Sequence, residues 1–227
     1  MNILQQIREE KNDVLPLTDR LYFDLLRDIL LGDLPRGSRL IESKLCDKYG
    51  ASRTPMRETF RRLETDGLVE YIPNRGTFVR GLTPLEVADL MAVWSDMEVH
   101  AVRWCVERMT DEEIEELQEI WGYAEYYTGK YDIPKLIDIN NAFHQCIYQG
   151  THDHFLADTL IKYQNYAAIA APPNYFAKNV MDRILAEHRR IYQAIVNRDA
   201  AAASRTMRLH MTNTIKRSSL VISIFED

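Results

Sequence analysis

The sequence predicts a mainly α-helical protein with a small N-terminal domain and a larger all-α bundle of about six helices. Two observations predict this architecture. Apolar residues recur at helical spacing along most of the 227 residues, and helix-start signals repeat beyond residue 82. A pattern of two short strands appears once, in residues 68–72 and 77–81, on either side of the turn-forming residues PNRG.

Composition limits the class of protein. Hydrophobic residues make up 46% of the chain, which is ordinary for a soluble core, and no window approaches eighteen consecutive apolar residues. The N-terminus carries charges where a signal peptide needs an apolar stretch. The three cysteines are widely spaced and form no Cys-x-x-Cys motif, so we expect buried thiols rather than disulfides or a zinc ribbon. We expect a cytoplasmic protein that does not enter a membrane.

Three helices are predicted before the strand pair, each followed by a glycine: residues 19–31 before Gly32, 43–49 before Gly50, and 52–66 before Gly67. Ser43 is the expected cap of the second helix. In the third helix either Ser52 or Thr54 can serve as the cap, and Pro55 fits the first turn because its missing N–H costs nothing there. Helix, helix, turn, helix and hairpin is the order of a winged helix-turn-helix.

Two domains are predicted, a winged helix-turn-helix over residues 1–81 and an all-α domain over residues 82–227. Capping boxes, in which a threonine precedes a glutamate by three residues, begin two helices: Thr83 with Glu86 and Thr110 with Glu113. We expect six helices in the second domain, at residues 84–108, 111–128, 133–149, 154–170, 175–197 and 200–218.

Charge is unevenly distributed along the chain. The formal net charge is −6, but between Arg36 and Arg80 ten basic residues outnumber six acidic ones. A DNA-binding face needs such a local basic excess, because much of the affinity for DNA comes from neutralising phosphates. The sequence therefore favours double-stranded DNA as a partner of the first domain.

The third predicted helix carries a cationic stripe. Arg53, Arg57 and Arg61 recur every four residues, next to an apolar face made of Met56, Phe60 and Leu63. A helix enters the major groove with its N-terminal residues at base edges, so Arg53, Thr54 and Arg57 are candidates for base contacts. Arg61 and Arg62 lie farther back and are expected at phosphates. The alternative is the solvated face of an ordinary amphipathic helix.

Arg75 and Gly76 lie at the tip of the predicted hairpin. A small residue lets the backbone approach the sugar-phosphate surface, and an arginine can enter a minor groove. We therefore expect both residues to contact DNA.

Three of the six histidines form a pattern in the second domain. Asn140 and His144 are four residues apart on one helix and point the same way. His188 and His210 each lie eleven residues from Asp199, at the turn of a helix hairpin, and therefore stand side by side if the hairpin is antiparallel. Three imidazoles and an amide oxygen could thus converge on one cation. The alternative is a set of core histidines satisfied by their neighbours.

Residues 26–79 closely resemble the DNA-binding domain of the GntR family of bacterial regulators. The most specific motifs are SRTPMRE, RRLETDGLV and PNRG. The resemblance implies that Arg53 and Arg57 contact operator bases and that Gly76 approaches the minor groove. Ser52 and Thr54, in the same SRTPMRE motif, are expected in the DNA-binding set.

Residues 84–218 look like the FCD effector domain of the FadR subfamily. In that resemblance the motifs NNAFH, EHRRI and RLHM supply the metal ligands: Asn140, His144, His188 and His210. It implies a divalent metal, with zinc favoured and nickel or manganese as alternatives. Asn140 is neutral where many members have aspartate, which should weaken the hold on the cation. Trp94 stands where the family commonly has an arginine four residues before the glutamate that aligns with Glu98.

The two resemblances together imply a homodimeric transcription regulator, most commonly a repressor. It would bind a pseudo-palindromic DNA operator and respond to a small-molecule effector, an organic acid or a related metabolite. Trp94 in place of arginine puts a simple small carboxylate in doubt and favours a larger or less charged effector; Trp94 as a core residue is the alternative.

Two rival functions use the same histidines. One is a metal-dependent hydrolase, since three histidines on zinc with an open position is also a hydrolytic arrangement. His152 and Asp153 echo the paired ligands of helical phosphohydrolases, but they are expected in a turn apart from the other histidines. The other rival keeps DNA binding and makes the helical domain a dimerisation module with a buried histidine cluster.

Overall fold

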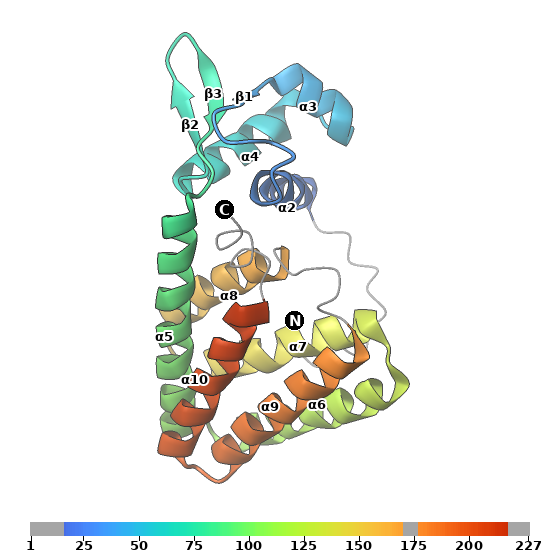
Figure 1. Ribbon diagram of the computed structural model, residues 1–227, viewed down its shortest axis with the longest axis vertical. Helices are drawn as coiled ribbons and strands as arrows, with labels where there is room; N and C mark the ends of the chain where they lie inside the picture. Colours follow the sequence, from blue (N-terminus) through green and yellow to red (C-terminus); the bar gives the residue numbers. More distant parts are fainter. Residues whose placement is uncertain (1–15, 170–176, 218–227) are drawn as a thin grey trace. The chain divides into compact units, whose positions relative to one another are not determined.

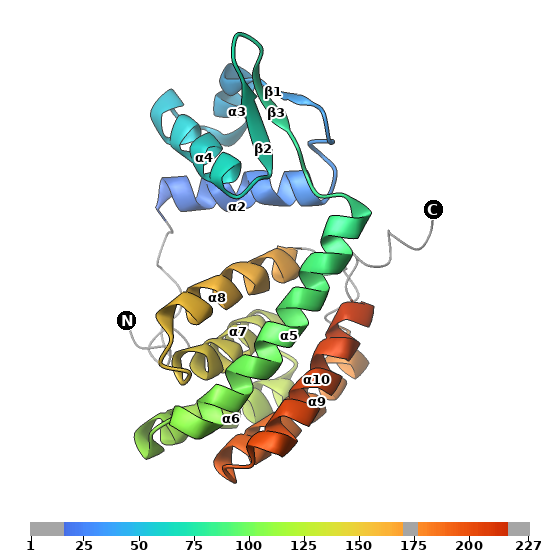
Figure 2. The same ribbon diagram turned by 90° about the vertical axis from the view of Figure 1, so that its left-hand side faces the viewer.

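The computed structural model describes residues 16–169 and 177–217, and the chain divides into two compact units between Val87 and Ala88 (Figures 1 and 2). We call them the N-terminal unit and the C-terminal unit. Most of the described chain is helical, which confirms the predicted fold class. Three predicted helix ends, at residues 170, 175–176 and 218, lie outside the described residues.

Three helices and a small sheet form the N-terminal unit. The helices are α2 (Leu17–Leu30), α3 (Glu42–Tyr49) and α4 (Arg53–Thr65). α2 runs beneath α4 (Figure 2), and both helices pack against each other through side chains that are almost completely buried: Leu21, Leu25, Met56 and Leu63. The predicted packing face of α4 is therefore confirmed.

The sheet has three antiparallel strands in the order β1-β3-β2. They are β1 (Arg39–Leu40), β2 (Val69–Ile72) and β3 (Gly76–Val79). The hairpin of β2 and β3 is the predicted wing, in which Asn74 and Gly76 both have positive φ, 62° and 100°. β1 was not predicted, because two residues carry no period that a sequence pattern can reveal.

The starts of α3 and α4 differ in part from the expectation. α3 begins at Glu42 after Ile41, whose carbonyl oxygen accepts the N–H of Leu45, so the prediction that Ser43 caps this helix is wrong. The extended chain of β1 continues to Ile41 and fixes the start one residue earlier. Ser52 is the residue at the N-cap of α4, but its side chain makes no capping hydrogen bond, and Thr54 lies inside the helix.

A buried carboxylate joins α2 to α3. Asp28 is 3% exposed, lies 2.5 Å from Lys48 Nζ and accepts a hydrogen bond from the Tyr49 hydroxyl. Burial alone would raise the pKa of Asp28, but the hydrogen bonds from Lys48 and Tyr49 outweigh it and hold that pKa below its usual value. Burial and the neighbouring carboxylate raise the pKa of Tyr49 to about 12.

The C-terminal unit contains α5 (Pro84–Arg108) from Ala88 onward and five further described helices: α6 (Asp111–Lys130), α7 (Ile133–Gln149), α8 (His154–Ile169), α9 (Lys178–Val196) and α10 (Ala200–Arg217). Both predicted capping boxes are confirmed. Thr83 and Glu86 exchange hydrogen bonds before α5, and Thr110 and Glu113 do so before α6.

The helices of the C-terminal unit pack as neighbouring pairs. α9 and α10 form a helix hairpin, α6 packs on both α7 and α9, and α8 packs on α7 (Figure 1). Arg198, in the turn between α9 and α10, donates hydrogen bonds to the carbonyl oxygens of Val106 and Met109 and thereby caps the end of α5. No helix within residues 16–169 and 177–217 is long and apolar enough to cross a membrane.

The three cysteines are free and buried, as the sequence analysis expected: Cys46, Cys105 and Cys146. Burial raises the pKa of the Cys105 thiol to about 12. Burial raises the pKa of the Cys146 thiol as well, so Cys105 and Cys146 are protonated and act as small apolar groups.

Candidate DNA-binding face and buried histidine cluster

The N-terminal half of α4 is anchored on one side and exposed on the other. Met56 is fully buried beneath the helix, which fixes its rotation. The predicted DNA-binding residues of this segment are all exposed on the outer side: Ser52, Arg53, Thr54, Arg57 and Arg61. The side chains of Arg53 and Arg57 are 73% and 63% exposed. This face can present cationic donors to a groove while its opposite side packs on α2.

A glutamate that was not predicted lies between the two leading arginines. Glu42, the first residue of α3, accepts a hydrogen bond from Arg57 Nε at 2.7 Å. Its other carboxylate oxygen lies 3.8 Å from Arg53 Nε. The hydrogen bond to Glu42 raises the pKa of Arg57. Sequence spacing gave no signal for this contact, because Glu42 and Arg57 belong to different helices.

Arg61 and Arg62 have different surroundings although they are neighbours in sequence. Arg62 lies over the Tyr22 ring, 3.9 Å from its centroid, and pairs with Asp19 at 2.6 Å. These contacts hold α4 to α2, so Arg62 is better explained as a packing residue than as a phosphate contact. Arg61 lies on the exposed side of the helix.

A basic residue that was not predicted, Arg39, lies beside the wing. Arg75 is exposed near the tip, with its guanidinium 5.6 Å from the Phe78 ring centroid. Arg39 of β1 lies opposite Phe78 in the strand register. A Cβ atom on Gly76 would lie only 3.1 Å from Arg39 Nε, so Gly76 also makes room for this guanidinium. Sequence analysis missed Arg39 because its place depends on the unpredicted strand β1.

Three histidines from three helices meet inside the C-terminal unit. His144 of α7, His188 of α9 and His210 of α10 are 5%, 5% and 2% exposed. Their ring centroids lie 4.7–5.4 Å apart, and one ligand nitrogen of each lies within 4.8 Å of those of the other two. Phe143 stacks on His188 at 4.6 Å between centroids and fixes that ring in place. The symmetric spacing about Asp199 therefore does bring His188 and His210 together.

Two carboxylates lie next to the cluster, and one of them orients an imidazole ring by a hydrogen bond. His210 Nδ1 lies 2.8 Å from Glu187, which Arg217 also contacts at 2.9 and 3.0 Å. Burial would raise the pKa of Glu187, but the hydrogen bonds from His210 and Arg217 outweigh it and lower the pKa to about 2. An ionised carboxylate only accepts hydrogen bonds, so His210 Nδ1 carries the proton and its Nε2 presents a lone pair.

The second carboxylate belongs to Glu98 of α5. This residue is completely buried, accepts a hydrogen bond from the Tyr148 hydroxyl, and lies 3.5 Å from His144 Nδ1. Burial and the nearby Glu98 raise the pKa of Tyr148 well above its usual value, so its hydroxyl remains a donor. Among the described residues, neither His144 Nδ1 nor the nearer Glu98 oxygen makes a hydrogen bond, so Glu98 lies near His144 without the hydrogen bond that Glu187 shares with His210.

Burial favours the neutral form of two of these imidazoles, His188 and His210. Burial lowers the pKa of His188 well below its usual value, and the neighbouring His210 and His144 lower it further. Burial also lowers the pKa of His210 despite its hydrogen bond to Glu187. His188 Nε2 is buried and has no hydrogen-bond partner in the described part of the chain. Neutral rings with open nitrogens are the form in which histidine binds metals.

Asn140 and Trp94 are the two remaining residues that the sequence analysis singled out in this unit, and each lies one helical turn before a residue at the cluster. Asn140 is half-buried on α7, one turn before His144. Trp94 is 4% exposed on α5, one turn before Glu98. Its indole Nε1 is buried close enough to the Tyr148 hydroxyl to lower the pKa of Tyr148, but it makes no well-aligned hydrogen bond among the described residues. A buried N–H of this kind is costly unless some other group pairs with it.

These features define a class of protein. A winged helix-turn-helix with an exposed basic helix, followed by an all-α unit, is the architecture of a DNA-binding transcriptional regulator. Residues 17–79 match the bacterial regulatory proteins of the gntR family, and residues 89–213 match the FCD domain. The chain belongs to the gntR family and carries an FCD domain, and its function is transcriptional regulation rather than catalysis.

Several known proteins are similar along most of their length. An uncharacterised HTH-type transcriptional regulator of Bacillus subtilis, YdhC, is 26% identical over 86% of this chain and 87% of its own. The HTH-type transcriptional repressor RspR of Escherichia coli is 22% identical over 90% of each chain. The solved structure of E. coli McbR/YncC superposes with a TM-score of 0.67 and 22% identity, covering 89% of this chain and 97% of that one, and shares its fold.

The hydrolase alternative is not supported, because both family matches are to regulators. The structure also separates the residues that suggested it. His152 lies in the turn before α8 with a φ of 53° and pairs with Glu113 at 3.0 Å, on the surface. It therefore takes no part in the buried cluster.

Proposed function

We propose that the regulator binds a pseudo-palindromic DNA operator as a homodimer, and that a small-molecule effector in the C-terminal unit changes its affinity for the operator. The observation that carries this proposal is the exposed basic face of α4, held in place by its buried opposite side. We further propose that it acts as a repressor, which is what the E. coli relative RspR is named.

The DNA contacts follow from the position of each side chain. Arg53, Thr54 and Arg57 lie in the first turns of α4 and reach base edges in the major groove, with Ser52 beside them at the helix start. Arg61, one turn farther along, meets phosphates. At the wing, Arg75 enters the adjacent minor groove and Gly76 lets the backbone approach it. The exposure of all these residues except the half-buried Gly76 supports this assignment.

The buried histidine cluster fits a divalent cation. Asn140, His144, His188 and His210 are the residues that would hold it, with zinc favoured by the nitrogen ligands and nickel or manganese as alternatives. The support is the donor set itself: three buried imidazoles, of which His210 is hydrogen-bonded to Glu187 and His144 lies near Glu98. A bound cation would supply the positive charge that attracts an anionic group of the effector.

The interior polar groups next to the cluster suit an organic effector larger than a simple carboxylate. Trp94 offers an aromatic surface and an indole N–H, and Glu98 offers a carboxylate oxygen that is buried without a hydrogen bond among the described residues. Such a ligand would bind by stacking and hydrogen bonds as well as through charge. Linkage requires reciprocity: an effector that weakens operator binding must itself bind less tightly to the operator complex.

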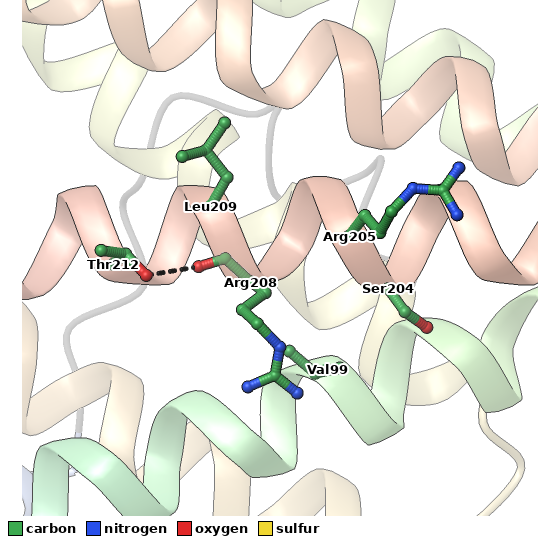
Figure 3. A pocket seen from close by; sticks show the side chains of 6 residues that line it. All are labelled: Val99, Ser204, Arg205, Arg208, Leu209 and Thr212. Atoms are coloured by element: carbon green, nitrogen blue, oxygen red, sulfur yellow. Dashed lines mark hydrogen bonds between the residues drawn. The ribbon is translucent and has the colours of Figure 1, made fainter.

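A surface of the C-terminal unit supports a homodimer. Val99 of α5 lies in a groove of about 380 Å³ with five residues of α10: Ser204, Arg205, Arg208, Leu209 and Thr212 (Figure 3). Exposed Asp96 of α5 pairs with Arg208 of the groove at 3.2 Å, Arg205 lies beside them, and exposed Val93 and Leu209 are 52% and 49% accessible. A patch that holds both signs of charge around apolar side chains is complementary to itself, as a two-fold interface requires. We assign the second copy to this surface.

The direct test is selection of DNA by the purified full chain from a pool of randomised duplexes. The proposal predicts enrichment of one sequence whose two inverted half-sites are one helical turn apart, bound by two chains. Enrichment of no sequence, or of a single asymmetric site bound by one chain, would contradict it.

A further inference from the structure

We propose that Glu42 is a positioning residue for sequence recognition: it holds the Arg57 guanidinium so that its outer edge is presented to a guanine. This inference rests on the proposed function, in which α4 reads DNA. It adds to that function a residue from a different helix, which does not need to touch the DNA itself.

Glu42 contacts only one edge of the Arg57 guanidinium, the edge that carries Nε. Glu42 receives the Nε–H of Arg57 at 2.7 Å, and the side chain of Glu42 is 26% exposed. It projects from the first residue of α3, so the backbone of a second helix fixes its place. Arg57 is therefore restrained near its Nε while the rest of its guanidinium extends into solvent.

This restraint leaves the useful donors free. Arginine has five N–H donors in a planar fork, and guanine is read by two of them through O6 and N7. Occupation of Nε by Glu42 leaves the terminal nitrogens Nη1 and Nη2 for a bidentate contact. Holding the fork in advance also reduces the conformational freedom that Arg57 would lose on binding.

The other carboxylate oxygen of Glu42 lies near Arg53. Its Nε lies 3.8 Å from Glu42, so one carboxylate lies beside both arginines at the start of α4. The negative charge also keeps the two guanidinium groups from repelling each other where they are close. Glu42 therefore restrains Arg57 by a hydrogen bond and attracts Arg53 by charge alone.

A different role for Glu42 would have the opposite effect on specificity. If Glu42 only repelled phosphates, its removal would strengthen binding to all DNA sequences equally. If Glu42 positions Arg57, its removal must weaken binding to the correct sequence relative to others. The ratio of the two affinities, rather than either affinity alone, therefore distinguishes the two roles.

The test compares the wild-type chain with Glu42→Ala, Glu42→Gln and the control Asp47→Ala, an exposed acid on the same helix. The probes are the duplex selected by the wild-type chain and the same duplex with its half-sites scrambled, titrated at one salt concentration. We expect Glu42→Ala to reduce the ratio of affinities at least about tenfold, the scale of one bidentate base contact. Glu42→Gln, which keeps an oxygen that can accept from Arg57, should reduce it less, and Asp47→Ala should leave it unchanged.

The proposal is overturned if Glu42→Ala binds both duplexes more tightly by the same factor, or if neither Glu42 variant changes the ratio. If the alanine variant fails to fold by circular dichroism, the isosteric glutamine variant decides: an unchanged ratio overturns the proposal and a reduced ratio supports it. Failure of the proposed function is a separate result, because the wild-type chain would then select no duplex at all.

Discussion

Single side chains hold the three helices of the N-terminal unit together. Arg62 spans from α4 to Tyr22 and Asp19 on α2, and Asp28 on α2 receives hydrogen bonds from the end of α3. The Arg62 contact lies at the surface, whereas Asp28 is buried. Both contacts fix the angle at which α4 is presented and so connect stability with DNA reading.

Replacing Tyr49 by phenylalanine should lower the free energy of unfolding by about 1–2 kcal/mol at neutral pH, because Asp28 loses a hydrogen bond inside the unit. The pH dependence has a definite sign. The depressed pKa of Asp28 stabilises the fold above its unfolded value of about 3.9, and this contribution is lost as the pH falls below it. The pKa of Tyr49, raised to about 12, contributes stability below about pH 10 that is lost as the pH rises toward 12.

Urea unfolding followed by circular dichroism between acid and alkaline pH measures both effects. Tyr71→Phe is the control, since Tyr71 is 59% exposed. Equal stability of Tyr49→Phe and the parent at neutral pH would show that the hydroxyl contributes nothing.

Arg39 should contact the DNA backbone beside the wing. Its replacement by alanine is expected to weaken binding to every duplex alike and to reduce the slope of log affinity against log salt concentration by about one. Salt titrations of wild type, Arg39→Ala and the control Arg103→Ala, an exposed arginine of α5, measure this slope. A slope that does not change would restrict Arg39 to packing against Gly76.

At the scale of helices and strands, the sequence predicted the elements that are determined by residues close together in the chain. The capping boxes at Thr83 and Thr110 and the regular apolar spacing gave α5 to α10 to within a few residues. Local signals missed β1, because a two-residue strand is defined only by its partner β3. They also misplaced the start of α3, because Ser43 is a good cap by composition, whereas the extended chain before Glu42 decides where the helix begins.

The contacts of the candidate sites also fall into those that sequence spacing predicted and those that it did not. His188 and His210 were predicted to meet because a helix hairpin has a simple symmetry about its turn. The carboxylates of Glu98 and Glu187 behind the histidines were not predicted, and neither was Glu42 beside Arg57. Each of these contacts joins different helices, and only tertiary packing determines them.

The pair of helices α5 and α10 carries the expected dimer surface. Replacing Leu209 by glutamate puts a charge into this surface and should convert the dimer into a monomer, which light scattering after gel filtration measures directly. Phe155→Glu, on the exposed start of α8, is the control and should remain dimeric. A dimeric Leu209→Glu chain would place the interface elsewhere.

At the scale of the whole molecule, the two units have different chemistry. The N-terminal unit collects exposed arginines, whereas the C-terminal unit buries histidines and carboxylates. Regulation by an effector requires that binding in the second unit changes how the first meets DNA. If a bound metal helps to hold the effector, its loss should change DNA binding by the N-terminal unit as well as effector binding by the C-terminal unit.

Metal content distinguishes a sensor from a simple dimerisation module. The purified chain should retain about one divalent ion per protomer after incubation with zinc and desalting, because three buried imidazoles converge in its interior. His188→Ala should lose the ion, His100→Ala, an exposed histidine of α5, should keep it, and Asn140→Asp should hold it more tightly. No retained ion in the parent would favour the dimerisation module.

The central claim is that α4 reads the operator through Arg57. The most direct measurement is the affinity of Arg57→Ala for the selected duplex, with its salt dependence, beside Arg189→Ala, an exposed arginine of α9 paired with Glu125. The structure predicts that Arg57→Ala loses retardation of the duplex while circular dichroism shows an intact fold, and that Arg189→Ala binds like the parent. Unchanged affinity and unchanged salt dependence for Arg57→Ala would contradict the assignment of α4 as the reading helix.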